Sequence, residues 1–242
     1  MDWGWGSMPS VCGVIEKGKS RGFVKMSTKV RILGASAFYN PDWFVEGYDH
    51  WSLNGMHNMV DPDEHELFSA WFQMHSEDQW RGGRNGMDHV AWLKEEHDFP
   101  IFMQTTHDDV PASMEYPIER VRKLWPKNLL PGPVLADSFC YMVGLAVVKG
   151  YKEIELEGLF MATLIEAYTE TFGLGAWLTI AALNGVKITD KTGCFPPFSY
   201  GYEPRKPRWW HPQNVAEALI VDELLPARQM RSAWNAERAH RG

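Results

Sequence analysis

Residues 136–161 read ADSFCYMVGLAVVKGYKEIELEGLFM, and this stretch decides the fold. Asp137 and Ser138 are of the residue types that cap a helix start, an apolar run fills 139–148, and Gly150 stands where a helix is expected to end. A strand is predicted over 153–157, directly after the helix. An apolar helix that leads into a short strand is the second half of a β-α-β unit, which joins parallel strands.

The same alternation of strands and helices extends on both sides of this unit. Strands are predicted over 30–34, 49–54, 67–75, 100–104 and 186–188, with a helix as the alternative for 67–75. Helices are predicted over 90–96, 118–124 and 174–183, and a long polar loop over 76–89. The pattern predicts an α/β, Rossmann-like fold, with a mostly parallel sheet and helices on both faces.

Composition and residue spacing divide the chain into three predicted segments. Residues 1–28 are rich in Gly, Ser and Lys and are interpreted as a flexible N-terminal extension. Residues 29–212 form the predicted nucleotide-binding domain, which ends in an irregular segment rich in Pro and aromatic residues. Residues 213–242 return to helical spacing and are predicted to be a helical tail.

Charge and composition argue against several classes of partner. The net charge of −7 disfavours strong non-specific binding to nucleic acid or to an anionic membrane. The three cysteines are scattered, so neither a disulfide framework nor a zinc site is predicted. No apolar run reaches the roughly 18 residues of a membrane span, and the first residues lack the pattern of a signal peptide, so we expect a cytoplasmic protein. The composition is compatible with a homo-oligomer, and some of the twelve tryptophans are expected either in the core or at a pocket rim.

Candidate binding residues follow from the position of ligands in open parallel sheets, which is at the carboxyl ends of the strands. The residues that come just after a predicted strand, or that begin the central helix, are Gly34, Ala35, Ser36, Asn54, His75, Gln104, Gly158, Asp137 and Ser138. The free N–H groups of a helix start can receive an anion such as a phosphate. The alternatives stay open, because Gly34 and Asn54 are also ordinary turn residues and His75 can be a structural histidine.

Two histidines are candidates for acid–base chemistry. His75 lies at a strand end, and His211 lies beside Trp209 and Trp210 in a basic and aromatic cluster that suits a phosphate, a sugar ring or an interface. No metal site is predicted, since the pair Asp61 and Asp63 reads as a solvated turn. The loop after residue 33 matches neither the dinucleotide fingerprint nor the P-loop.

Several segments between residues 29 and 203 carry a resemblance to known families, namely KVRILGAS, WSLN, WFQMH, the stretch 136–161 and GVKI…YGYE. They resemble the bacterial sialyltransferases that use CMP-sialic acid. They equally resemble the Rossmann-like proteins grouped with flagellin-modifying motility factors and 6-hydroxymethylpterin pyrophosphokinases, and the pattern is similar to that of uncharacterised phage proteins.

The resemblance implies roles for several residues. It implies that Gly34 and Ser36 meet the nucleotide phosphates, that Asn54 contacts the nucleotide and that Ser138 opens a helix facing it. Gly158 and Leu159 match the residues that precede a characteristic Asp of the family. Phe160 stands in place of that Asp here, which signals either a different ligand or the loss of transferase activity.

These observations favour a phage-type, nucleotide-sugar-dependent glycosyltransferase, with a CMP- or UDP-sugar as donor. A first alternative is a non-catalytic protein, either one that binds or sequesters a nucleotide or a structural phage protein. A second alternative is a pyrophosphokinase-like transferase, whose chemistry normally requires Mg²⁺ to neutralise the phosphates.

Overall fold

A computed structural model describes residues 27–34, 44–128, 132–159 and 164–191. The predicted extension 1–28 and tail 213–242 lie almost wholly outside these ranges, as do Ala35, Ser36, Phe160 and His211. Within the described part of the chain, no helix is both long and apolar enough to cross a membrane.

Seven parallel strands form one sheet in the order β5-β4-β3-β2-β1-β6-β7. The strands are β1 (Lys29–Leu33), β2 (Asp49–Leu53), β3 (Phe68–Gln73), β4 (Ile101–Met103), β5 (Ser113–Glu115), β6 (Glu153–Glu157) and β7 (Lys187–Asp190). The chain runs outward from β1 to β5, crosses back, and adds β6 on the other side of β1. All carboxyl ends therefore lie at one edge of the sheet.

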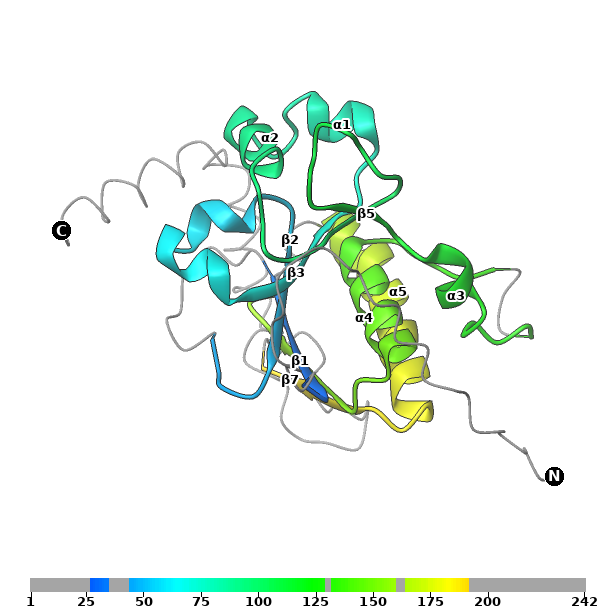
Figure 1. Ribbon diagram of the computed structural model, residues 1–242. Coiled ribbons are helices and arrows are strands. Elements are labelled where there is room, and N and C mark those ends of the chain that lie inside the picture. The colour runs from blue at the N-terminus through cyan, green and yellow to red at the C-terminus, as the bar shows by residue number, and fades with distance from the viewer. Residues whose placement is uncertain (1–26, 35–43, 129–131, 160–163, 192–242) are drawn as a thin grey trace, which may run out of the picture.

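Helices cover both faces, which confirms the predicted α/β, Rossmann-like fold (Figure 1). The α-helices are α1 (Glu77–Arg81), α2 (Met87–Leu93), α3 (Ile118–Arg122), α4 (Ser138–Lys149) and α5 (Leu164–Leu183), and two 3₁₀ helices, η2 (Asn54–Met59) and η3 (Pro62–Leu67), lie between β2 and β3. Figure 1 shows α4 and α5 lying side by side along the sheet.

Alternate residues of the strands supply two separate apolar cores. Ala70 and Phe72 face the core formed with α4 and α5, whereas Trp71 between them faces the core formed with α1 and α2. The centre of β3 is buried on both faces, and Ala70, Trp71 and Phe72 there are apolar without alternation, as is usual for a central parallel strand. The strand interpretation of 67–75 is therefore confirmed and the helix alternative is wrong.

The tryptophans of the described residues belong to these cores. Each is at most 6% exposed, and none lines either of the pockets described below; they are Trp51, Trp71, Trp80, Trp92, Trp125 and Trp177. The six described tryptophans therefore pack in the cores and do not line the rim of either pocket.

Three parts of the structure differ from the sequence prediction. The loop predicted over 76–89 contains α1 and the start of α2, because Ser76 and Gln79 form a reciprocal capping box and Trp80 buries itself in the core. Strand β5 was not predicted, because its three residues lie at the sheet edge and do not alternate between buried and exposed. Helix α5 begins at Leu164 rather than near 174, and Gly173 within it packs against Ala136 and Cys140.

The contact between β1 and β6 joins the two halves of the sheet. Arg31 is only 2% exposed, and its Nε lies 2.6 Å from Oε1 of Glu155 on the neighbouring strand. A buried charge of this kind is tolerated only when it is paired. Just beyond β1, the amide of Gly34 donates a hydrogen bond of 2.8 Å to the carbonyl of Glu157.

Gly34 is required by this close backbone approach. A Cβ at this position would lie 2.6 Å from the carbonyl oxygen of Gly158 and 2.8 Å from Cα of Leu159, and both are backbone atoms that cannot rotate away. We therefore expect Gly34→Ala to lower the free energy of unfolding by about 1–3 kcal/mol, the usual cost of overpacking. Urea denaturation measures this change.

Gly132→Ala is the matched control, since a Cβ there would meet nothing within 4 Å and the residue has no positive φ. We expect it to alter the unfolding free energy by no more than about 0.5 kcal/mol. Equal destabilisation by the two substitutions would contradict the account of Gly34.

Candidate functional site

A cleft of about 480 Å³ lies at the carboxyl edge of the sheet, between the ends of β2 and β3 and the start of α4. Four of the residues that the sequence predicted for binding or catalysis line it together, namely Asn54, His75, Asp137 and Ser138. The remaining lining residues are Leu53, Met74, Gln79, Arg84, Asn85, Leu135, Ala136, Phe139, Tyr141 and Glu170.

Other predicted residues lie elsewhere. Gly34, Gly158 and Leu159 do not line the cleft: Gly34 and Gly158 pack against each other, and Leu159 is 3% exposed in the apolar core. Because the Gly34 amide is already bonded to Glu157, it is not available to a phosphate in this arrangement. Gln104 lines a neighbouring pocket, and Ala35, Ser36 and His211 lie outside the described residues.

Asn54 has an unusual backbone conformation for a side-chain-bearing residue. Its φ is 49°, and it is the one non-glycine residue with a positive φ in the described part of the chain. Asn tolerates this left-handed region better than most residues. Its Oδ1 is buried and has no hydrogen-bond partner among the described residues. A left-handed backbone and a buried oxygen without a partner both cost free energy, and such features are often found at functional positions.

Asp137 and Ser138 begin helix α4. Asp137 is the N-cap, and its Oδ1 accepts a 2.7 Å hydrogen bond from the amide of Cys140, while its Oδ2 is buried without a partner among the described residues. Burial raises the pKa of Asp137 above its ordinary value, against the lowering effect of the hydrogen bonds from the helix start. The first turn of α4 therefore offers the cleft both a positive helix end and a carboxyl group of raised basicity.

Arg84 is the one cationic side chain among the residues that line the cleft. It is exposed, and no salt bridge joins it to another residue of the described chain. The acidic side chains of the lining are Asp137 and Glu170. An exposed guanidinium in a cleft favours a negatively charged ligand, since it binds carboxylate or phosphate through two parallel hydrogen bonds.

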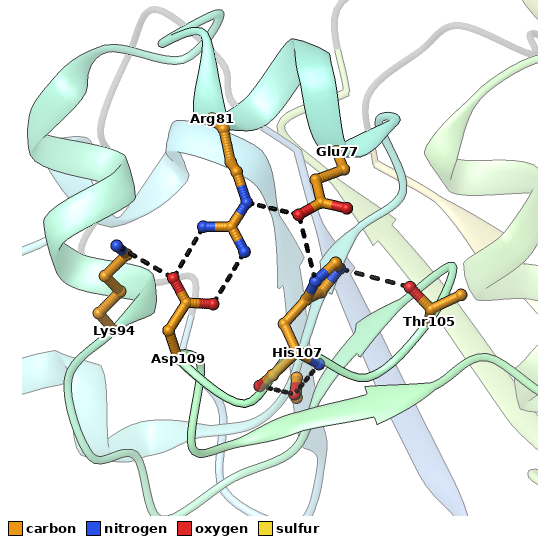
Figure 2. A network of polar contacts seen from close by, with 7 residues as sticks. Glu77, Arg81, Lys94, Thr105, His107 and Asp109 are labelled. Atoms are coloured by element: carbon orange, nitrogen blue, oxygen red, sulfur yellow. Dashed lines mark hydrogen bonds and ion pairs between the residues drawn. The ribbon is translucent and has the colours of Figure 1, made fainter.

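Figure 2 shows an ion network that ties α1 to neighbouring segments. Gln79, which lines the cleft, lies on this helix. Arg81 binds Asp109 through two bonds of 2.7 and 2.8 Å and binds Glu77 at 2.6 Å, and Lys94 adds a 3.1 Å contact to Asp109. This geometry ties α1 to the loop before β5 and to the end of α2. It thereby holds the 77–85 wall of the cleft in place.

His75 is half-buried at the cleft, and a buried polar chain stands behind it. The Nδ1 of His75 lies 3.1 Å from Nε2 of Gln73, whose Oε1 lies 2.7 Å from Nε2 of His89. The ring of His89 in turn stacks on that of His57 at 5.1 Å. Gln73 and His89 are both fully buried. Burial, followed by the nearby Arg84, lowers the pKa of His75.

Sequence reasoning missed Gln79, Arg84 and Asn85, because it treated their segment as a loop. The available signal was the Ser76-x-x-Gln79 pattern, which is a capping box and predicts a helix start. Tyr141 was also missed, although it lies three residues after Ser138 and therefore on the same helix face. Gln73 and His89 carried no signal, since their contact joins residues sixteen positions apart.

The buried histidine His89 predicts a loss of stability in mild acid. Burial, and to a lesser extent His75, lowers the pKa of His89 from 6.5 to about 4. Between these two pH values His89 is therefore protonated in the unfolded chain and neutral in the folded chain. Stability is therefore full above pH 6.5 and falls as the pH drops toward 4. From this group we expect a loss on the order of 2 kcal/mol between pH 7 and pH 5.

His89→Gln isolates the effect, because glutamine can also donate to Gln73 but does not titrate. Urea unfolding at both pH values would give a smaller difference for the variant than for the wild type. An unchanged difference would contradict the assignment of His89 as a buried neutral imidazole. The comparison cancels the opposite contribution of Asp137, whose raised pKa favours the folded state at lower pH.

Comparisons with known proteins give only distant likenesses. No protein-family model and no curated protein matches the chain. Among solved structures, the apo α-2,3-sialyltransferase from Campylobacter jejuni aligns with a TM-score of 0.45 and 16% identity, over 68% of this chain and 75% of that chain.

The sialyltransferase CstII from Campylobacter jejuni in complex with cytidine-5'-monophosphate aligns with a TM-score of 0.41 and 14% identity, over 67% of this chain and 78% of that one. The same enzyme in complex with CMP-3FNeuAc aligns with a TM-score of 0.37 and 14% identity, over 67% and 79%. In fold, the chain is distantly similar to bacterial sialyltransferases.

Proposed function

We propose that this protein is a nucleotide-sugar-dependent glycosyltransferase that binds its nucleotide in the cleft between β2, β3 and α4. One observation carries the proposal: Asn54, His75, Arg84 and the start of α4 line a single cleft at the carboxyl edge of a parallel sheet. Ligands of open α/β sheets bind at this edge. The sequence resemblance of 136–161 to nucleotide-dependent transferases supports the same reading.

The groups at the cleft suit the parts of a nucleotide. The phosphates would lie toward Arg84 and the first turn of α4 at Ser138, where a guanidinium and a helix start both favour negative charge. The Asn54 amide can donate to and accept from a base or ribose. Its left-handed backbone would hold the side chain at a fixed place for that contact.

A second pocket supports transfer rather than binding alone. It has a volume of about 520 Å³ and shares Met74, Leu135 and Tyr141 with the nucleotide cleft. Gln104 and Arg122 also line it, and the Tyr141 ring offers an aromatic wall. Two adjoining compartments are what a transferase needs for a donor and an acceptor, and a nucleotide-sequestering protein needs only one. We assign the second pocket to the acceptor.

The proposed reaction transfers the sugar to an acceptor hydroxyl. The hydroxyl oxygen forms a bond to the anomeric carbon, the bond from that carbon to the phosphate oxygen breaks, and the nucleotide leaves with the electron pair. The hydroxyl proton passes to a base, and Asp137 is our choice because it lines the cleft at the start of α4 and burial raises its pKa. Arg84 and the α4 start would stabilise the charge that develops on the leaving phosphate.

One sequence feature favours a second function, which is nucleotide binding without turnover. Phe160 stands where the resembling family has an Asp, so a polar group of that family is missing here. The resemblance to phage proteins would place either activity in the cytoplasm of an infected bacterium.

Reversal of the charge on Arg84 tests the phosphate position. We expect Arg84→Glu to weaken the binding of CMP, measured by calorimetry, at least tenfold, because an attraction of the phosphate is replaced by a repulsion. Arg120→Glu is the matched control, since Arg120 is also exposed but lines neither pocket. If both substitutions weakened CMP binding equally, the effect would come from the overall charge of the protein, and the placement of the phosphate at Arg84 would be contradicted.

Asn54→Gly separates the amide from the backbone conformation. Glycine adopts a positive φ without strain, so we expect the unfolding free energy to stay within about 1 kcal/mol of the wild type. We expect CMP affinity to fall about tenfold through loss of the side-chain hydrogen bonds. Unchanged affinity in a stable variant would remove Asn54 from the nucleotide site.

Incubation with a panel of CMP- and UDP-sugars and candidate acceptors distinguishes the two functions. Transfer predicts a glycosylated acceptor and free nucleotide, both detected by mass spectrometry. Tight binding with the nucleotide sugar recovered intact would establish the non-catalytic alternative. A complete lack of binding and turnover across the panel would refute both.

A further inference from the structure

The polar chain behind His75 determines which ring nitrogen of that histidine carries the proton. Gln73 is the last residue of β3 and is fully buried. Its Nε2 lies 3.1 Å from Nδ1 of His75, and its Oε1 lies 2.7 Å from Nε2 of His89 and 3.4 Å from Nδ2 of Asn85. Both ends of the amide are therefore engaged.

The chemistry of an amide then fixes the direction of every bond. The amide nitrogen of Gln73 can only donate, so Nδ1 of His75 must accept and has no proton. The amide oxygen can only accept, so His89 donates through Nε2–H, and Asn85 donates through its own amide. In neutral His75 the single ring proton must then reside on Nε2.

The reversed amide is the less favourable arrangement. If the Gln73 amide were rotated by half a turn, its NH₂ group would face His89, which would have to accept through Nε2 and carry its proton on Nδ1. That Nδ1 is buried and has no partner within the described part of the chain. A buried N–H without an acceptor is rarer in proteins than an under-satisfied acceptor. The side-chain amide of Asn85, which donates to the Gln73 oxygen, would also have to rotate so that its own oxygen accepts from the Gln73 NH₂ group.

Nε2 is the ring nitrogen of His75 that remains for a ligand in the cleft. His75 lines the cleft while its Nδ1 is turned toward buried Gln73, so Nε2 is the nitrogen left for a ligand. Among the described residues, the one hydrogen-bond contact of the His75 ring is that of Nδ1 with Gln73. The cation Arg84 and the buried His89 are its titratable neighbours, and burial together with Arg84 favours the neutral ring.

We propose that Gln73 is a positioning residue that holds His75 as the neutral Nε2–H tautomer, and that the ligand atom at His75 is an anionic oxygen that accepts this hydrogen bond. In this tautomer Nε2 has no free electron pair, so His75 does not take a proton from an acceptor hydroxyl through that atom. His75 thus joins Arg84 as a donor to the anion, and proton removal falls to another group. The identity of the anion as a nucleotide phosphate rests on the proposed function, whereas the tautomer does not.

Nitrogen-15 NMR of the full chain tests the tautomer directly, because long-range proton–nitrogen correlations distinguish Nε2–H from Nδ1–H imidazole. At pH 7 we expect His75 in the Nε2–H form. In Gln73→Glu a carboxylate replaces the donor, so we expect His75 to change to the Nδ1–H form and its pKa to rise. Observation of the Nδ1–H form in the wild-type protein would overturn the proposal without reference to any variant.

Gln79→Glu is the matched control. It adds the same negative charge to the cleft wall and keeps an oxygen that accepts the 3.2 Å hydrogen bond from the amide of Ser76. We expect it to shift the pKa of His75 while the tautomer stays Nε2–H. A change of tautomer in this control would show that charge alone, and not the contact with Gln73, sets the proton position.

Titration with inorganic phosphate and with CMP tests the ligand. We expect both to shift the Nε2 resonance of His75 while the tautomer is retained. A shift with phosphate alone would support the anionic oxygen and count against the nucleotide function. No shift with either probe would overturn the assignment of an anion at His75.

Discussion

The parallel pairing of β6 with β1 is the constraint on which the rest of the structure depends. The chain reaches the far edge of the sheet at β5 and must return through α4 to place β6 beside β1. This return brings the start of α4 to the edge where β2 and β3 end. The buried pair of Arg31 and Glu155 and the close backbone approach at Gly34 hold the register. Without the pairing of β6 with β1, Asn54, His75 and Asp137 would not line the same cleft.

Much of this fold could be predicted from the sequence, because short segments with strand-type residues are separated by turn residues and α4 carries both of its end signals. The Asp137 cap and Gly150 mark its limits, and Gly150 has the expected left-handed backbone. Short elements were lost because a turn and a half of helix has no measurable period. For α1, the signals present in the sequence are the Ser76 capping box and the apolar Trp80, which is buried.

The candidate site was predictable only where it follows from topology. The rule that ligands meet strand ends found Asn54 and His75, and the helix start found Asp137 and Ser138. The same rule selected Gly34, whose actual contacts are with the neighbouring backbone, since a glycine needed for packing looks identical in sequence to one needed for a phosphate. Arg84 was missed with the rest of its segment, which was treated as a loop, whereas Gln73 and His89 behind His75 depend on side-chain contacts that no spacing reveals. Together these groups give one chemical picture, in which the cleft presents donors to an anion and a carboxyl group to a proton.

Hydrogen–deuterium exchange of the full chain with and without CMP tests the central claim most directly. The account predicts that CMP slows exchange in the segments that form the cleft, 53–55, 74–85 and 137–141, and leaves the outer strand β7 unchanged. Slowed exchange confined to the ends of β1 and β6, or no change in any segment at saturating CMP, would contradict it.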